Sequence, residues 1–216
     1  GYFVLGIVYS MQLLAGHTQS AFISLVGAIL YGLGLAVTQP SSHPTTQPPN
    51  HPAITRHPSR EAVVRHLASF VIRHSSFVLL AVLLSAAQLL PTLELSRESL
   101  RSGGLPLREA LSFSLDPRLL GRALLPNYSR ALFSEFTAYL GVVGLALAAL
   151  GIRKTPHRLA LLALALVGLA FALGAYDPLY ALLAALPPFN LFRVPARWLF
   201  LFAFAAAMLA GHGLDE

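Results

Sequence analysis

Long apolar runs alternate with short polar breaks along most of the chain, and this alternation predicts the fold class. The apolar runs cover residues 1–15, 21–37, 67–90, 136–152, 159–173 and 199–209. A helix of roughly 20 apolar residues spans the hydrocarbon core of a bilayer. We therefore expect an all-α fold, a polytopic transmembrane helical bundle with about five full spans plus a truncated first helix, and with short interfacial helices on the outer face.

The polar breaks divide the chain into three parts. Residues 1–37 hold the truncated helix and the first full span, joined by a polar hairpin tip. Residues 38–66 form a Pro/His-rich flexible linker, and residues 67–216 form the membrane domain. We expect this domain to carry an outer loop at 92–135 and an outer re-entrant or interfacial segment at 174–197.

The linker is rich in Pro, Thr, Ser, Gln and His and has too few apolar residues to build a core. The linker contains four histidines, His43, His51, His57 and His66. Their spacings of eight, six and nine residues match no metal-ligand motif. We expect no metal site and no cofactor.

Local signals also predict how the outer loop begins and where it touches the membrane. Pro91 is expected to end the span before it, because proline removes a helical hydrogen bond. Within 119–124, the apolar residues share one helical face opposite Arg118 and Arg122. This pattern is typical of a short helix that lies on the membrane surface.

The turn 153–158 is short and basic, and it predicts the orientation of the chain. Short loops rich in Lys and Arg stay on the cytoplasmic side. Counting spans from that turn places the linker and the C-terminus inside, and it places the tip at His17 and the segments 92–135 and 174–197 outside. All the polar breaks with plausible chemistry then lie on one face.

Composition supports a membrane protein and narrows its partners. The chain has 216 residues, of which 56% are hydrophobic and 11% charged, against roughly 25% charged in soluble domains. Its net charge of +6 indicates contact with lipid headgroups or phosphate. The sequence has no basic stripe with interleaved aromatics, which is the pattern that would predict nucleic-acid binding. No phosphate-binding glycine loop, nucleophile elbow or cysteine is present.

Arg193 and Arg197 stand at the start of the last span, with Pro195 at the first helical position. Cations at a helix N-terminus are unfavourable unless an anion lies between them. One interpretation is a clamp on phosphate by two planar guanidinium groups. The alternative is a pair of interfacial arginines beside Trp198 in an aromatic belt.

Four more polar residues are candidates for contacts with a sugar. His17 and Gln19 lie in the first polar break, where the alternative is a satisfied hairpin turn. Asn127 and Tyr128 lie in a Pro-Asn-Tyr-Ser sequence that a simple turn explains equally well.

Two acidic residues are candidates for catalysis. Glu94 follows a span end, where partial desolvation would raise the pKa of its carboxyl group. Its alternative is a surface ion pair with Arg97. Asp177 precedes Pro178, and its alternative is the N-cap of a short outer helix over 179–186.

Five segments, taken together and in this order, resemble the YfhO-like family of bacterial membrane proteins. They are LLAGHTQ at 13–19, QLLPTLEL at 88–95, LLPNY at 124–128, FRVPARW at 192–198 and AGHGLD at 210–215. The fourth is the most specific. The resemblance covers nearly the full chain outside the Pro/His-rich linker, and Thr18 stands where the family typically has proline.

The resemblance implies a GT-C type glycosyltransferase in the bacterial cytoplasmic (inner) membrane. Such enzymes take a sugar from a polyprenyl-phosphate carrier and transfer it on the outer face, here to a cell-envelope polymer acceptor. Their catalytic acidic residue lies in the first outer loop. This chain begins inside an apolar run, so we expect it to be a piece of a longer protein whose catalytic acid lies upstream of Gly1.

Two other functions fit the same residues. A lipid-linked sugar carrier or flippase would use the arginines on the headgroup and break no bond. A non-catalytic envelope-assembly protein would use them only as membrane anchors.

Overall fold

The computed structural model describes residues 2–38, 60–99, 102–126, 132–155 and 157–214, and this part of the chain is helical with no strand. The long helices are α1 (Tyr2–Leu14), α2 (Thr18–Thr38), α3 (Arg60–Glu98), α6 (Val142–Lys154), α7 (Arg158–Ala172) and α9 (Leu199–Leu214). The short α-helices are α4 (Leu107–Ala110), α5 (Leu120–Leu124) and α8 (Pro178–Leu183). The 3₁₀ turns are η1 (Pro117–Leu119), η2 (Ser134–Phe136), η3 (Gly174–Tyr176), η4 (Phe189–Leu191) and η5 (Pro195–Trp198).

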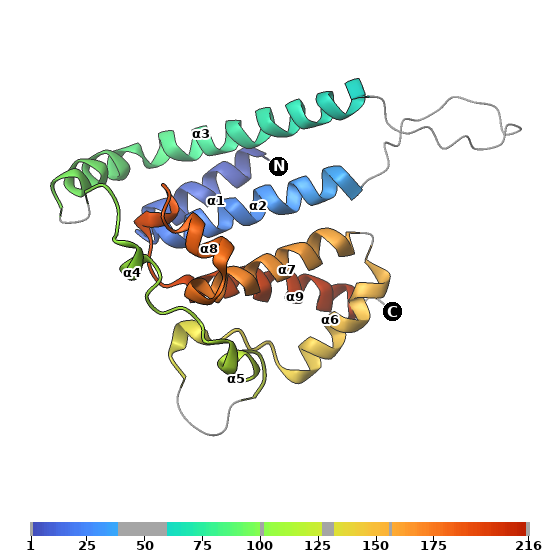
Figure 1. The fold of residues 1–216 in the computed structure, drawn as a ribbon. Helices are drawn as coiled ribbons and strands as arrows, with labels where there is room; N and C mark the ends of the chain where they lie inside the picture. Colours follow the sequence, from blue (N-terminus) through green and yellow to red (C-terminus); the bar gives the residue numbers. More distant parts are fainter. Residues whose placement is uncertain (1, 39–59, 100–101, 127–131, 156, 215–216) are drawn as a thin grey trace, which may run out of the picture.

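The long helices pack side by side in a bundle (Figure 1). Helix α9 packs against α6 and α7, α2 packs against α7, and α1 packs against α3. Glycines allow a close approach between α6 and α9. A Cβ on Gly151 would collide with the backbone of Leu209, and one on Gly213 would collide with the backbone of Leu147. Small residues at such crossings let two backbones come into van der Waals contact, which is how membrane helices gain packing energy.

Three helical stretches are long and apolar enough to cross a membrane: Thr18–Leu35, Ser75–Glu98 and Pro195–Leu214. The predicted spans over 136–152 and 159–173 correspond to the shorter apolar helices α6 and α7, which have 13 and 15 residues, so the expected count of about five full spans is not confirmed. Large apolar side chains on α1 and α3 are exposed, among them Phe3, Ile72 and Leu83. Such helices indicate a membrane protein whose outer surface contacts lipid.

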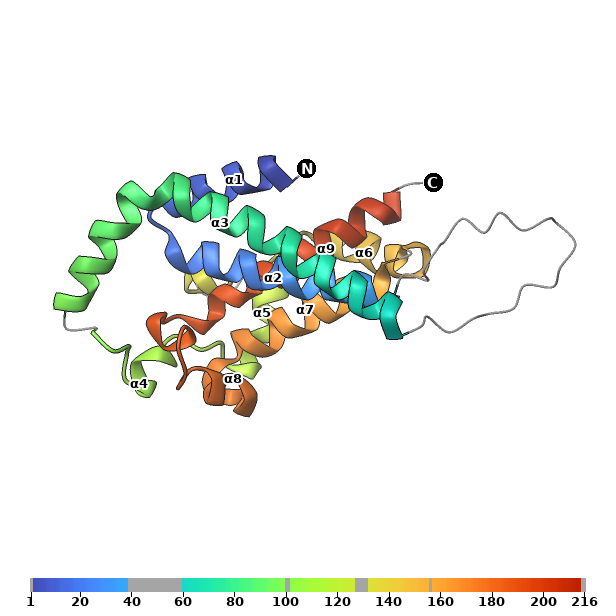
Figure 2. The ribbon, with the colours of Figure 1, turned by 90° about the horizontal axis from the view of Figure 1, so that it is seen from above.

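Helix α3 continues through Pro91 to Glu98, so the prediction that Pro91 ends this helix is wrong. Proline removes one backbone hydrogen bond and bends a helix without always terminating it. The Thr92 hydroxyl donates to the Gln88 carbonyl at 2.8 Å, a bond that also favours bending. Figure 2 shows the C-terminal part of α3 turning away from the axis of the rest.

The apolar face of the 119–124 segment packs on protein, which differs from the expected helix lying on the membrane. Ala123 is fully buried, and Leu119, Leu120 and Leu124 pack against the core. The Ala123 carbonyl also accepts a hydrogen bond of 2.9 Å from the Ala138 amide. Hydrophobic periodicity in the sequence shows that one face of a helix is shielded from water, but it does not show whether protein or lipid covers that face.

Trp198 is the centre of an aromatic cluster where the ends of α2, α7 and α9 meet. Its side chain is 1% exposed, and its ring contacts those of Phe22, Phe171, Tyr180 and Phe189. The indole N–H donates to the Tyr180 hydroxyl at 3.2 Å. Trp198 therefore lies inside the protein and not in an interfacial aromatic belt.

The two ends of the bundle carry different segments. The start of α2, the end of α3, and helices α4 and α8 lie together at one end (Figures 1 and 2). The end of α2, the starts of α3 and α7, and the ends of α6 and α9 lie at the other. The first of these ends is where the polar side chains described next converge.

Candidate functional site

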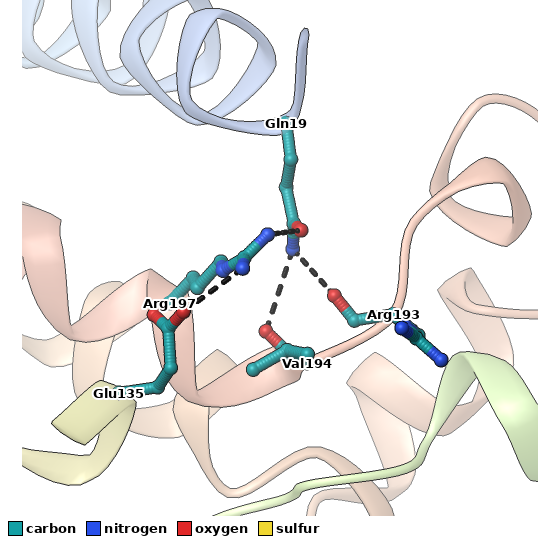
Figure 3. Close-up of polar contacts among 5 residues, drawn as sticks. All are labelled: Gln19, Glu135, Arg193, Val194 and Arg197. Carbon is teal, nitrogen blue, oxygen red and sulfur yellow. Dashed lines mark hydrogen bonds and ion pairs between the residues drawn. The ribbon is translucent and has the colours of Figure 1, made fainter. Parts of the chain in front are cut away.

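Gln19, Glu135 and Arg197 form a polar network at the end of the bundle that carries α8 (Figure 3). Arg197 Nη1 donates to Gln19 Oε1 at 2.6 Å, and Arg197 Nη2 donates to Glu135 Oε1 at 2.8 Å. Gln19 Nε2 donates to the carbonyl oxygens of Arg193 at 2.7 Å and Val194 at 3.4 Å. The network thus joins the start of α2, the turn η2 and the turn η5.

Gln19 is the buried member of the network. It lies in the first turn of α2 and its residue exposure is 7%. Its amide uses both ends, because the oxygen accepts from a guanidinium while the NH₂ group donates to two carbonyls. These contacts fix the orientation of the Gln19 amide. If the amide were flipped, its NH₂ group would point at the guanidinium of Arg197, which is also a donor.

The backbone at Val194 turns two carbonyl groups toward Gln19. Val194 has φ of +65°, a left-handed conformation that is costly for a β-branched residue. The segment on either side holds it there. The Val194 amide donates to the Ser112 carbonyl at 3.1 Å, and Pro195 begins η5 directly afterwards. The strained residue therefore positions both arginines of the predicted clamp.

Arg197 is held by an ion pair that is neither fully buried nor fully exposed. The side chains of Arg197 and Glu135 are 29% and 32% exposed. Water reaches both groups, so the pair contributes modestly to stability, on the order of 1 kcal/mol or less. Its main effect is geometric, because two hydrogen bonds from separate nitrogens set the direction of the guanidinium plane.

Arg193 stands beside this network but its side chain does not enter it. The residue is exposed, and Figure 3 shows its side chain pointing away from Gln19 and Arg197 while its carbonyl faces Gln19. Within the described residues, its guanidinium group makes no hydrogen bond or ion pair. The structure thus brings the backbone of Arg193 to Arg197 without bringing the two guanidinium groups together.

The other candidates for sugar contact are placed as follows. His17 is exposed directly before α2, and its carbonyl accepts from the Ala21 amide at 3.1 Å. Gln19 belongs to the network. Asn127 and Tyr128 lie outside the described residues.

The two acidic candidates lie apart from the network. Glu94 is exposed on the bent end of α3, and it makes no ion pair with Arg97 in the described structure. Asp177 is the N-cap of α8, where Oδ1 accepts from the Leu179 amide at 3.0 Å. Asp177 Oδ2 is buried and has no hydrogen-bond partner among the described residues.

Glu135 is the site residue that sequence reasoning missed. It is a single acid in a short segment before a span, 62 positions from Arg197. No local spacing links two residues so far apart. The only signal was a lone carboxylate next to an apolar run, and that signal occurs elsewhere in the chain.

Searches found no protein-family model, no curated protein and no solved structure that matches this chain. Within the residues that the structure describes, no group of three or more His, Asp or Glu side chains is arranged to hold a metal ion.

Proposed function

We propose that this chain is part of an integral membrane glycosyltransferase of the YfhO-like type. It uses a polyprenyl-phosphate-linked sugar as donor and glycosylates a cell-envelope polymer on the outer face. One observation carries the proposal. The segment with the most specific resemblance, FRVPARW, is joined directly to a second one, LLAGHTQ, because Gln19 binds the carbonyls of Arg193 and Val194 and the guanidinium of Arg197.

The two arginines have different tasks in this proposal. Arg193 is exposed and its guanidinium has no partner within the described residues, so it is the cation that binds the carrier's phosphate. Arg197 is occupied by Gln19 and Glu135 and positions the loop that presents Arg193. A phosphate that also reached Arg197 would compete with the carboxylate of Glu135.

The proposal includes a membrane topology. About five helices cross the bilayer of a bacterial cytoplasmic membrane, with α6 and α7 doing so where the bilayer is thin or the short turns beside them extend the span. The basic turn after α6 and the C-terminus are cytoplasmic.

A lipid-linked sugar carrier is the second candidate, and one observation favours it. The carboxylate of the network, Glu135, is already paired with Arg197. A carrier needs a headgroup site but no free acid or base, so this arrangement is sufficient for it.

Sugar transfer from a radiolabelled polyprenyl-phosphate donor tests the proposal. Membranes holding the full-length protein are compared with Arg193→Ala and with the control Arg153→Ala, an exposed arginine at the other end of the bundle. Loss of a charge-assisted phosphate contact predicts about tenfold less transfer for Arg193→Ala and unchanged transfer for the control. No transfer by the wild-type protein would favour the carrier, and equal transfer by both variants would overturn the role of Arg193.

A further inference from the structure

A cavity that is widely open to the protein surface, and separate from the Gln19–Arg197 network, lies between η1 and η3. It has a volume of about 370 Å³ and is lined by Asp116, Pro117, Arg118 and Tyr176. That volume lies within the range of small-molecule sites, roughly 300–1,000 Å³. None of the lining residues takes part in the polar network around Arg197.

The two walls of the cavity are tied together by hydrogen bonds. The Leu115 amide donates to the Ala172 carbonyl at 2.9 Å, and the Ala175 amide donates to Ser114 Oγ at 2.9 Å. Gly174 has φ of +54°, and a Cβ there would collide with Ser114 Oγ. The walls are therefore positioned by the protein itself, and a ligand that enters does not have to order them.

The charged groups in the cavity are open to a ligand. Asp116 Oδ1 accepts from the Arg118 amide at 2.8 Å, which caps η1 and leaves the second carboxylate oxygen available. The guanidinium group of Arg118 is exposed and has no hydrogen bond or ion pair within the described residues. Tyr176 is 55% exposed and presents part of its ring.

We propose that this cavity binds a glycosyl phosphate. Arg118 binds the phosphate through a forked, charge-assisted contact. Asp116 repels phosphate but accepts hydrogen bonds from sugar hydroxyl groups, so the ligand lies with its sugar toward Asp116. The ring of Tyr176 covers an apolar face of the sugar. A bare inorganic anion would use only one of these three groups.

The choice of a sugar as the ligand rests on the proposed glycosyltransferase or carrier function, whereas binding itself does not require transfer. The same chemistry has two sources, a soluble sugar phosphate or the headgroup of a lipid-linked sugar. Binding is therefore measured in nanodiscs with the full-length protein carrying Arg193→Ala, which removes the phosphate contact proposed above, and the ligands are glucose 1-phosphate, inorganic phosphate, and a short-chain polyprenyl phosphoglucose.

Three variants test the lining groups, and one serves as a matched control. Arg118→Gln removes the cation, Tyr176→Leu removes the ring, and Asp116→Asn removes the charge while keeping an oxygen that can cap η1. Arg108→Gln changes an exposed arginine in α4 that does not line the cavity. Size-exclusion chromatography and circular dichroism check that each variant is folded.

We expect at least one of the two glycosyl phosphates to bind, and Arg118→Gln and Tyr176→Leu each to weaken it about tenfold, with Arg108→Gln unchanged. Whichever sugar compound binds identifies the source. Equal binding of inorganic phosphate, or binding that none of the three lining variants changes, would overturn the proposal. So would no binding of either sugar compound. Binding that depends on Arg118 in a protein that transfers no sugar would retain the cavity assignment while rejecting the transferase.

Discussion

Gln19 Oε1 and Arg197 Nη1 lie 2.6 Å apart although 178 positions separate the two residues in the chain. This hydrogen bond joins the start of α2 to the turn that begins the last membrane helix. The Gln19 amide also donates to the carbonyls of Arg193 and Val194, the two consecutive carbonyl groups that flank the Val194 Cα. One side chain thereby positions both arginines at this end of the bundle.

Gln19→Leu should destabilise the protein. The change leaves the Arg193 and Val194 carbonyls and one Arg197 nitrogen without their partner, at a cost of about 1–3 kcal/mol. Thermal unfolding in detergent measures the loss. The control is Gln12→Leu, a partly buried position in α1 with no side-chain hydrogen bond in the described structure. Equal melting temperatures for the two variants would contradict the role of Gln19.

Glu135→Ala should remove an ion pair with Arg197 whose contribution to stability is small and depends on salt concentration. Both side chains are about one third exposed, so the coupling energy in a double-mutant cycle with Arg197→Ala should be below about 1 kcal/mol. Raising the NaCl concentration should reduce it, because salt screens exposed charges. A coupling of several kcal/mol that salt does not change would show that the pair is buried in the bilayer environment.

Gly104→Ala should be more destabilising than Gly103→Ala. Both glycines have positive φ, +101° and +87°, so each alanine meets backbone strain of roughly 1–2 kcal/mol. At Gly104 the added Cβ also collides with the side chain of Asn190, whereas at Gly103 it meets open space. Thermal unfolding of the two variants gives the difference, and similar losses would argue against close packing of Gly104 on Asn190.

Tyr180 should make stability fall at alkaline pH. Burial raises the pKa of its phenol above 10, and the hydrogen bond from Trp198 only partly offsets this. The unfolded chain then loses the proton first as pH rises, so the folded state loses stability above about pH 10. Tyr180→Phe should remove this part of the pH dependence, and the exposed control Tyr139→Phe should retain it. The comparison uses denaturant unfolding at pH 8 and pH 11.

Tyr180→Phe should also cost stability at neutral pH. The indole N–H of Trp198, 1% exposed, would lose the acceptor that it has at 3.2 Å. An unsatisfied buried donor costs about 1–3 kcal/mol. The unfolding free energy at pH 8 in the same experiment measures it, and a value equal to that of the wild-type protein would mean that water replaces the hydroxyl.

The absence of cysteine from the sequence allows a direct test of topology. His17→Cys and Arg108→Cys should react with a membrane-impermeant maleimide in intact cells, because both lie at the end of the bundle proposed to face outward. Arg153→Cys should react only after the membrane is permeabilised. Labelling of all three positions from the same side would reject the proposed orientation.

Several features of the fold follow from local sequence signals. The apolar run at 21–37 predicts a helix, and α2 covers Thr18–Thr38. Asp177 before Pro178 predicts a capped helix, and α8 begins there. Hydropathy, caps and breaks depend on neighbouring residues, so they can be read without knowing the fold. The same signals failed at Pro91, because α3 bends there and continues to Glu98.

The sequence by itself determined that the chain is helical, largely apolar and polar at the breaks between its runs. Only the tertiary structure decided that Trp198 and Ala123 are covered by protein, that Glu135 holds Arg197, and that the side chain of Arg193 turns away. The physical reason is distance. Hydropathy is a property of each residue and its neighbours, whereas an ion pair or a buried ring depends on which distant segments the fold brings within a few ångströms.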